Sequence, residues 1–196
     1  MIPRALILLA CAALLCACPH KPSDDLAQHL QPTATIPQSS PLLTYDSFHL
    51  GMSNLEVAQK FNAPSGKGKG FKRGVEDYGD VRNQIIDFDP LKGQPMRRVV
   101  LRLYQDKLAK LVDRRDHLSG KQAAEWLAAL KKTYGAPKAE TLPGAEWLWG
   151  DPQELSLTYT QDNRSPSDMT ATVVLEHKPT ADAAENYLHY RASKGQ

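Results

Sequence analysis

The feature that most constrains the fold is an approximate internal repeat, in which a capped helix is followed by alternating β-strand segments. Residues Ser53–Glu56 and Ser119–Gln122 both fit a capping box, in which a serine hydroxyl accepts a backbone N–H while Glu or Gln reaches back to the cap. The two predicted helices end shortly before Pro64 and Pro137. The repeat therefore predicts two units, each a helix followed by antiparallel strands.

Three strands are expected after each helix, because apolar and polar residues alternate there. The predicted strands cover residues 81–89, 98–105, 108–114, 146–150, 155–160 and 171–177. The segment Val99–Leu101 has a counterpart in Val173–Leu175, which supports the repeat. Thr180 is expected to cap a final helix. The prediction is an α+β fold of two fused helix-plus-antiparallel-meander units with a C-terminal helix.

The first 18 residues resemble a bacterial lipoprotein export signal. Arg4 precedes an apolar run of about 13 residues, which is too short to cross a bilayer core of about 30 Å as a stable helix. The run ends in Leu15-Cys16-Ala17-Cys18, with an aliphatic residue three before the last cysteine and a small residue just before it. The resemblance implies removal of residues 1–17 and lipidation of Cys18. A similar pattern ending at Cys11 leaves too short an apolar run.

Residues 18–43 are predicted to form a lipidated, disordered tether. Pro, Ser, Thr and Gln are abundant, and five prolines break any helix or central strand, namely Pro19, Pro22, Pro32, Pro37 and Pro41. Pro19 stands where Asp marks inner-membrane retention in lipoproteins of enteric-type bacteria, which favours the periplasmic face of the outer membrane. The α+β domain is expected to occupy residues 44–196, in units of about 44–116 and 117–196.

The charge of the chain is small but unevenly distributed. The formal net charge of +2 becomes +1 without residues 1–17, whose one charged residue is Arg4. Residues 66–115 hold 13 Lys or Arg and 7 Asp or Glu, whereas residues 139–196 hold 4 and 9. Either self-association or a polar partner would use such an asymmetry, and an unevenly charged solvated surface explains it equally. Without Cys11 and Cys16 the folded part has no thiol, so packing rather than disulfides must stabilise it.

The segment from Gly66 to Gly74 places four cations among glycines, namely Lys67, Lys69, Lys72 and Arg73. It lacks the closing Gly-Lys-Ser/Thr of a Walker A loop. As an open loop it would suit anionic lipid headgroups or lipopolysaccharide. The alternative is a solvated loop that binds nothing. Export makes nucleic acid the poorest ligand, so none is expected as a partner.

Neighbouring acidic residues supply two candidate acid–base groups. Asp113, Asp116 and His117 lie close together near a predicted strand end, where turn and surface roles are expected. Asp87 and Asp89 alternate on a strand, as a carboxylate pair for glycosidic chemistry would, but Asp89 precedes a proline and favours a turn. Neither group predicts a catalytic site.

Other site types are also not expected. The six histidines lack metal-ligand spacing, and no Gly-x-Ser-x-Gly elbow is present. Trp147, Trp149 and Tyr159 would stack on a sugar or peptide if exposed, and would pack in the core if buried. The sequence therefore predicts no catalytic residue, no cofactor and no metal.

The first unit resembles the SmpA/OmlA (BamE-like) lipoproteins. The resemblance rests on Leu50-Gly51-Met52-Ser53, Glu56-Val57 and Phe61-Asn62-Ala63-Pro64, followed by a meander with a tight turn before Lys107-Leu108. It covers about 65 residues and implies a small α+β periplasmic module that supports outer-membrane β-barrel assembly. The tandem arrangement is similar to the β-lactamase inhibitor proteins, which form a concave binding sheet from two such units.

We therefore expect a non-enzymatic, lipid-anchored envelope lipoprotein that binds or scaffolds in the periplasm, in outer-membrane protein assembly or envelope integrity. Its expected partners are the membrane, through the N-terminal lipid, an envelope protein and anionic lipid headgroups. Two alternatives remain open, namely a periplasmic inhibitor of a hydrolase and an enzyme acting on peptidoglycan.

Overall fold

The structure is a computed structural model that describes residues 35–36, 40, 44–62, 71–88, 90, 93–162, 165 and 167–195. The predicted signal and Cys18 lie outside these residues. Of the predicted tether the structure describes Thr35, Ile36 and Ser40, and Ile36 packs against the core. Within the described ranges, no helix is long and apolar enough to cross a membrane.

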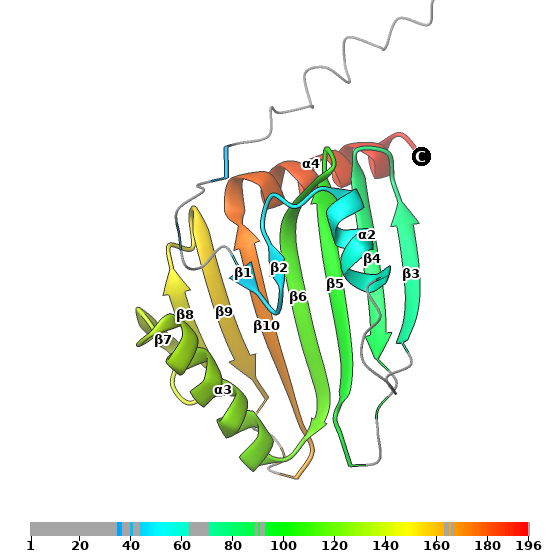
Figure 1. Ribbon diagram of the computed structural model, residues 1–196. Helices are drawn as coiled ribbons and strands as arrows, with labels where there is room; N and C mark the ends of the chain where they lie inside the picture. The colour runs from blue at the N-terminus through cyan, green and yellow to red at the C-terminus, as the bar shows by residue number, and fades with distance from the viewer. Residues whose placement is uncertain are drawn as a thin grey trace, which may run out of the picture.

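One eight-stranded antiparallel sheet forms the centre of the fold (Figure 1), in the order β3-β4-β5-β6-β10-β9-β8-β7. The strands are β3 Phe71–Asp77, β4 Val81–Phe88, β5 Met96–Tyr104, β6 Lys107–Leu118, β7 Ala139–Leu142, β8 Glu146–Gly150, β9 Leu155–Gln161 and β10 Met169–His177. Strands β3–β6 form one meander and β7–β10 another. Pairing of β6 with β10 joins the two into one sheet.

The helices lie on both faces of this sheet. The remaining elements are β1 Thr44–Tyr45, β2 Phe48–His49, α2 Asn54–Asn62, α3 Gly120–Tyr134 and α4 Lys178–Ser193. The β1–β2 hairpin, α2 and α3 cover the face nearest the viewer in Figure 1, and α4 crosses the ends of the strands on the other face. The predicted α+β class and the C-terminal helix are therefore confirmed.

Both predicted capping boxes are present. The Ser53 amide donates to Glu56 Oε2 at 2.7 Å, and the Glu56 amide donates back to Ser53 Oγ at 3.2 Å. At α3 the equivalent bonds join Ser119 and Gln122 at 2.8 and 3.3 Å. Helix α3 ends at Gly135, whose φ of 81° suits glycine.

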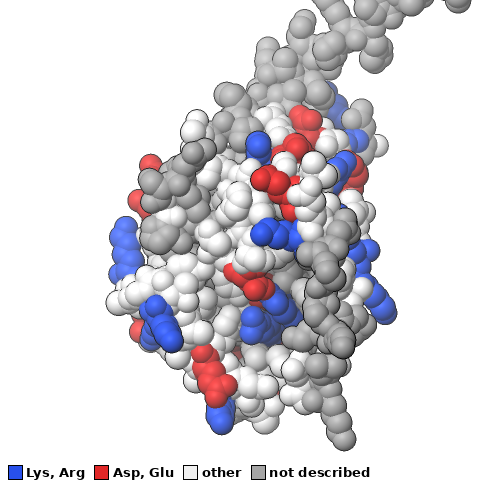
Figure 2. Space-filling view, viewed as in Figure 1, with Lys and Arg blue, Asp and Glu red and all other residues white. Residues whose placement is uncertain are grey.

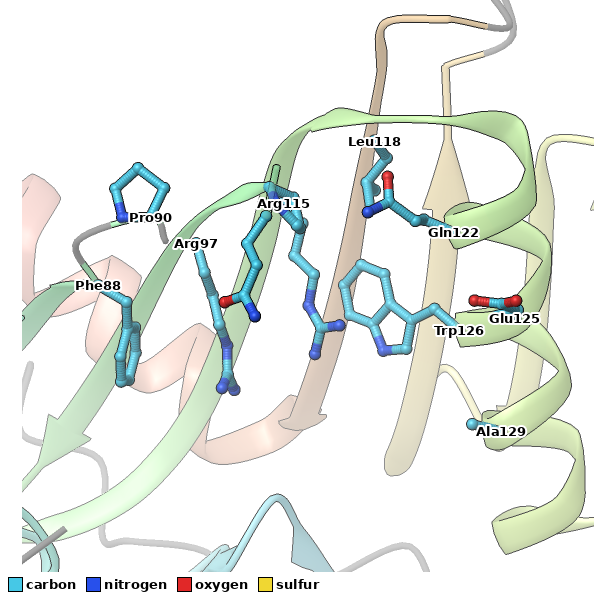
Figure 3. A pocket seen from close by; sticks show the side chains of 11 residues that line it. Phe88, Pro90, Arg97, Arg115, Leu118, Gln122, Glu125, Trp126 and Ala129 are labelled. Atoms are coloured by element: carbon cyan, nitrogen blue, oxygen red, sulfur yellow. The ribbon is translucent and has the colours of Figure 1, made fainter. Parts of the chain in front are cut away.

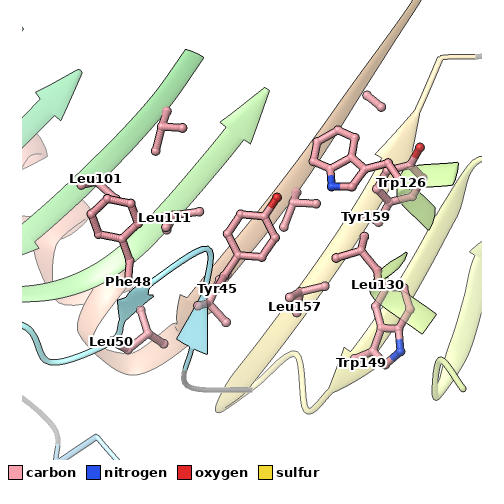
Figure 4. Close-up of a cluster of buried hydrophobic side chains, with 14 of the residues drawn as sticks. Tyr45, Phe48, Leu50, Leu101, Leu111, Trp126, Leu130, Trp149, Leu157 and Tyr159 are labelled. Atoms are coloured by element: carbon pink, nitrogen blue, oxygen red, sulfur yellow. The ribbon is translucent and has the colours of Figure 1, made fainter. Parts of the chain in front are cut away.

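The larger core lies between the sheet and α3, α2 and the hairpin (Figure 4). Alternation along each strand directs one set of side chains to this face, such as Leu155, Leu157 and Tyr159 of β9. From α3, Trp126 meets Tyr159 edge to face, with ring centroids 5.4 Å apart. A smaller core on the other face packs α4 against the sheet, and its buried residues are Val81, Tyr104, Ala109, Ala183, Ala184 and Tyr187.

Two sequence predictions about the elements were wrong. Each of the two meanders has four strands rather than three, because β3 and β7 are edge strands whose polar composition hides the alternation. Helix α4 starts at Lys178, and Thr180 lies inside its first turn, where its hydroxyl meets His177 Nδ1 at 2.8 Å. The proline at position 179 fits this start because the first turn of a helix needs no proline N–H.

Candidate functional site

A large part of one sheet face carries no helix in the described structure. Helix α4 packs on this face at one end of the central strands, where it contacts Val81, Tyr104 and Ala109 and pairs Glu185 with Arg102. The side chains beyond α4 are therefore partly open to solvent. We call this region the open face.

An apolar row runs across the open face at right angles to the strands. Its members pair directly from strand to strand, in the order Gly74, Ile85, Val100, Val112, Val174, Thr158, Leu148 and Ala139. Six of them, from Ile85 to Leu148, are each partly exposed. A continuous row of half-exposed aliphatic and threonine side chains can bury apolar area against a partner without any change in the fold.

A charged row flanks the apolar row on the side away from α4. Lys72, Asp87, Arg98 and Arg114 follow one another across β3, β4, β5 and β6. Arg98 donates to both carboxylate oxygens of Asp87, at 2.6 and 3.1 Å, and this bonding lowers the pKa of Asp87. Arg114 pairs with Asp116 at 2.9 Å. The row presents three cations and one carboxylate, and this pattern would orient a polar partner.

The predicted anionic-ligand loop is only partly described. Lys67 and Lys69 lie outside the described residues, whereas Lys72 and Arg73 lie in β3, not in a loop. Because neighbouring strand residues point to opposite faces, Lys72 lies on the open face beside Asp87. Arg73 lies on the other face, where its Nη2 donates to Gln84 Oε1 at 2.7 Å. These two cations therefore do not share one binding surface.

The strand β6 directs the side chains of its three candidate acid–base residues to different places, namely those of Asp113, Asp116 and His117. The surface role predicted for Asp113 was wrong, since its side chain is 0% exposed on the core face of β6. Asp116 lies toward the other face and accepts from Thr170 at 2.7 Å. His117 pairs with Asp168 at 2.8 Å on the surface. The three side chains cannot act on one substrate.

Asp113 instead organises a buried ion cluster that the sequence analysis missed. It accepts from Tyr45 Oη at 2.8 Å, from Arg97 Nη2 at 2.8 Å and from Arg115 Nη2 at 3.4 Å. Burial, together with the Asp113 charge, raises the pKa of Tyr45. The sequence could have indicated this burial, because Asp113 is two residues from the core residue Leu111 and therefore lies on the same face of the strand.

The aromatic cluster belongs to the core. Trp147, Trp149 and Tyr159 are all buried, and Trp149 Nε1 donates to the Gly135 carbonyl at 2.9 Å. Tyr159 Oη donates to the Ala123 carbonyl at 3.2 Å, and burial raises the pKa of Tyr159 to about 12. These rings tie α3 to the sheet and are closed to a sugar or peptide.

The remaining candidates form no common site. Asp87 is held by Arg98, and Asp89 lies outside the described residues. Over the part of the chain that the structure describes, no group of three or more His, Cys, Asp or Glu is arranged to hold a metal ion. On the helix-bearing face, basic and acidic side chains are interspersed (Figure 2), so the charge asymmetry of the sequence does not produce a single-sign field there.

The fold thus defines an α+β protein with a single large antiparallel sheet, one face of which is largely open. No family model, characterised protein or solved structure matches the chain. Any assignment of function therefore rests on the sequence patterns and on the geometry of the open face.

Proposed function

We propose that this protein is a non-enzymatic, lipid-anchored envelope lipoprotein that binds another envelope protein through the open face. The single observation that carries the proposal is the in-register apolar row across the sheet. Partly exposed side chains of that row give an area for association, and the flanking charges of Arg98 and Arg114 give orientation.

The position of the N-terminal segment supports this use of the open face. Tyr45, in the β1–β2 hairpin, donates to buried Asp113 on the helix-bearing face. Tyr134 Oη donates to the Thr44 carbonyl at 2.6 Å and fixes the same hairpin to α3. The chain that leads to Cys18 therefore joins the domain on the face opposite to the open face, and an anchored protein could still present that face to a partner.

The lipoprotein part of the proposal is supported by the residues that precede Cys18, and Pro19 favours the outer membrane, facing the periplasm. The test is Cys18→Ser in the full chain. Labelled palmitate should be lost and the unprocessed precursor should accumulate. Continued labelling of that variant would show that Cys18 is not the anchor.

The binding part is tested by cross-linking in intact cells of the source bacterium, followed by purification in mild detergent. Val112→Glu and Val174→Glu place a charge in the middle of the apolar row and should remove the cross-linked partner. Leu55→Glu is the matched control, because Leu55 is an apolar residue of α2 that is 66% exposed on the other side of the sheet. Loss with Leu55→Glu but not with the valine variants would contradict the proposal.

The resemblance to BamE-like lipoproteins favours a role in outer-membrane protein assembly or envelope integrity. A second candidate is a periplasmic inhibitor of a hydrolase, favoured by the two four-stranded meanders joined into one sheet. Recovery of barrel-assembly proteins in the cross-linking experiment supports the first. Stoichiometric inhibition of a β-lactamase or wall hydrolase, abolished by Val112→Glu, supports the second.

A further inference from the structure

A groove of about 670 Å³ lies on the helix-bearing face, between α3 and the ends of β4, β5 and β6 (Figure 3). It is opposite to the open face, so a ligand bound there is independent of the proposed function. Apolar side chains form much of its wall, namely Phe88, Pro90, Pro95, Leu118, Trp126 and Ala129. Arg97, Arg115, Gln94, Gln122 and Glu125 supply its polar groups.

Two arginines in the groove are each stacked against an aromatic ring. The guanidinium carbon of Arg115 lies 3.8 Å from the centroid of the Trp126 ring, and that of Arg97 lies 4.9 Å from the centroid of Phe88. Figure 3 shows the two arginines side by side between Phe88 and Trp126. Stacking holds a guanidinium flat and limits its rotation, which prepares its N–H groups for a planar acceptor.

Arg115 has fewer acceptors than its charge requires. Within the described residues its guanidinium makes one long hydrogen bond, from Nη2 to Asp113 at 3.4 Å. Its Nε is buried and has no acceptor there. Arg97, by contrast, donates from both Nε and Nη2 to Asp113 and from Nη2 to Asp46. An oxygen that enters the groove would therefore give Arg115 an acceptor that the protein does not supply.

The charges around the groove limit the kind of anion that it accepts. Asp113 pairs with both Arg97 and Arg115, and Asp46 of the hairpin pairs with Arg97. Glu125, in the α3 wall of the groove, pairs with Lys121 at 3.8 Å. Two carboxylates thus balance most of the charge of the two guanidinium groups, and they would repel a doubly charged phosphate more than a singly charged carboxylate. Because much of the groove wall is apolar, an anion that carries an apolar group would bury that group against the wall.

We infer that this groove binds a carboxylate that carries an apolar side group, with Arg115 as the main donor. A free small acid and the C-terminus of a peptide with an apolar last residue share this chemistry. A carboxylate has two coplanar acceptor oxygens, which match the planar N–H array of an arginine, and its apolar group would pack against Trp126 and the prolines.

The test uses the full-length chain in detergent micelles, with micelles alone as the blank. Hydrocinnamate and the peptide acetyl-Ala-Ala-Phe are titrated by calorimetry, and each is compared with its uncharged amide. Both carboxylates should bind saturably and the amides at least about 10-fold more weakly, because they lack the charge that meets Arg115. Tighter binding of the peptide identifies a chain terminus as the ligand, and equal or tighter binding of hydrocinnamate identifies a small acid.

Two variants locate the binding. Arg115→Gln should weaken binding at least about 10-fold, while the matched control Arg114→Gln, which removes a charge from the adjacent position on the other face, should change it less than about 2-fold. If Arg115→Gln does not fold, Gln122→Glu is used in its place. This variant keeps the capping box of α3 but adds a negative charge to the groove wall, so it should weaken binding of the carboxylates. Absence of saturation up to about 10 mM, equal binding of the amides, or wild-type affinity in the variant that folds would overturn the inference.

Discussion

Replacement of Asp113 by Asn is expected to destabilise the protein strongly. The carboxylate is fully buried and accepts hydrogen bonds from Tyr45, Arg97 and Arg115. Asn keeps the size of the side chain but removes the negative charge and turns an amide NH₂ toward two guanidinium groups. Breaking a buried ion cluster on one side typically costs about 3–5 kcal/mol, which is a large part of a total stability of about 5–15 kcal/mol.

The matched control is Asp87→Asn, which makes the same chemical change in a nearby strand. Asp87 also bonds Arg98 through both oxygens, but the two side chains are 43% and 58% exposed. Water screens that pair, so its loss should cost about 0–1 kcal/mol. Urea titration followed by far-UV circular dichroism gives the free energy of unfolding of each variant.

Salt adds an independent check. The effect of Asp87→Asn should shrink as salt is raised, whereas that of Asp113→Asn should change little, because ions do not reach the buried cluster. If both substitutions cost the same within about 0.5 kcal/mol, the argument that burial distinguishes the two aspartates is refuted.

Three further results are expected. Ser119→Ala should lower the free energy of unfolding by about 1 kcal/mol in a urea titration, because the Gln122 amide loses its cap. Trp126→Ala should cost about 3–5 kcal/mol by the same assay, since Trp126 is 8% exposed and packs edge to face on Tyr159; a loss below about 1 kcal/mol would mean that α3 is misplaced. Burial lowers the pKa of His177 below 6.5, so stability that is present above about pH 6.5 should decline as the pH falls and the unfolded chain takes up a proton. His177→Gln should flatten that part of the thermal-stability profile between about pH 7 and pH 5.5, and an unchanged profile would exclude His177 as its cause.

The sequence placed some of the candidate site residues correctly and others on the wrong face of a strand. The hydrophobic role of Trp147 and Trp149 was one of two alternatives in the sequence, and burial against α3 decides it. The surface role predicted for Asp113 was wrong because β6 continues to Leu118, so that Asp113 lies inside the strand on its buried face. Strand alternation then separates residues that are close in sequence, and it also puts Lys72 and Arg73 on opposite faces.

The sequence by itself determined the features that depend on a few neighbouring residues. Both capping boxes, at Ser53 and Ser119, are present because each is made by side chains and amides three residues apart. The six inner strands were also found from alternation, since one side of each strand faces a core.

The tertiary structure alone decided the features that depend on which strands lie side by side. Strands β3 and β7 lie at the edges with mostly exposed side chains, so pairing with one neighbour rather than burial defines them. The apolar row through Val100, Val112 and Val174 exists only because β5, β6 and β10 pair in this register, and a shift of one residue would exchange the two faces of the shifted strand. The packing of the whole sheet decides which distant strands pair, and no pattern of neighbouring residues predicts that packing.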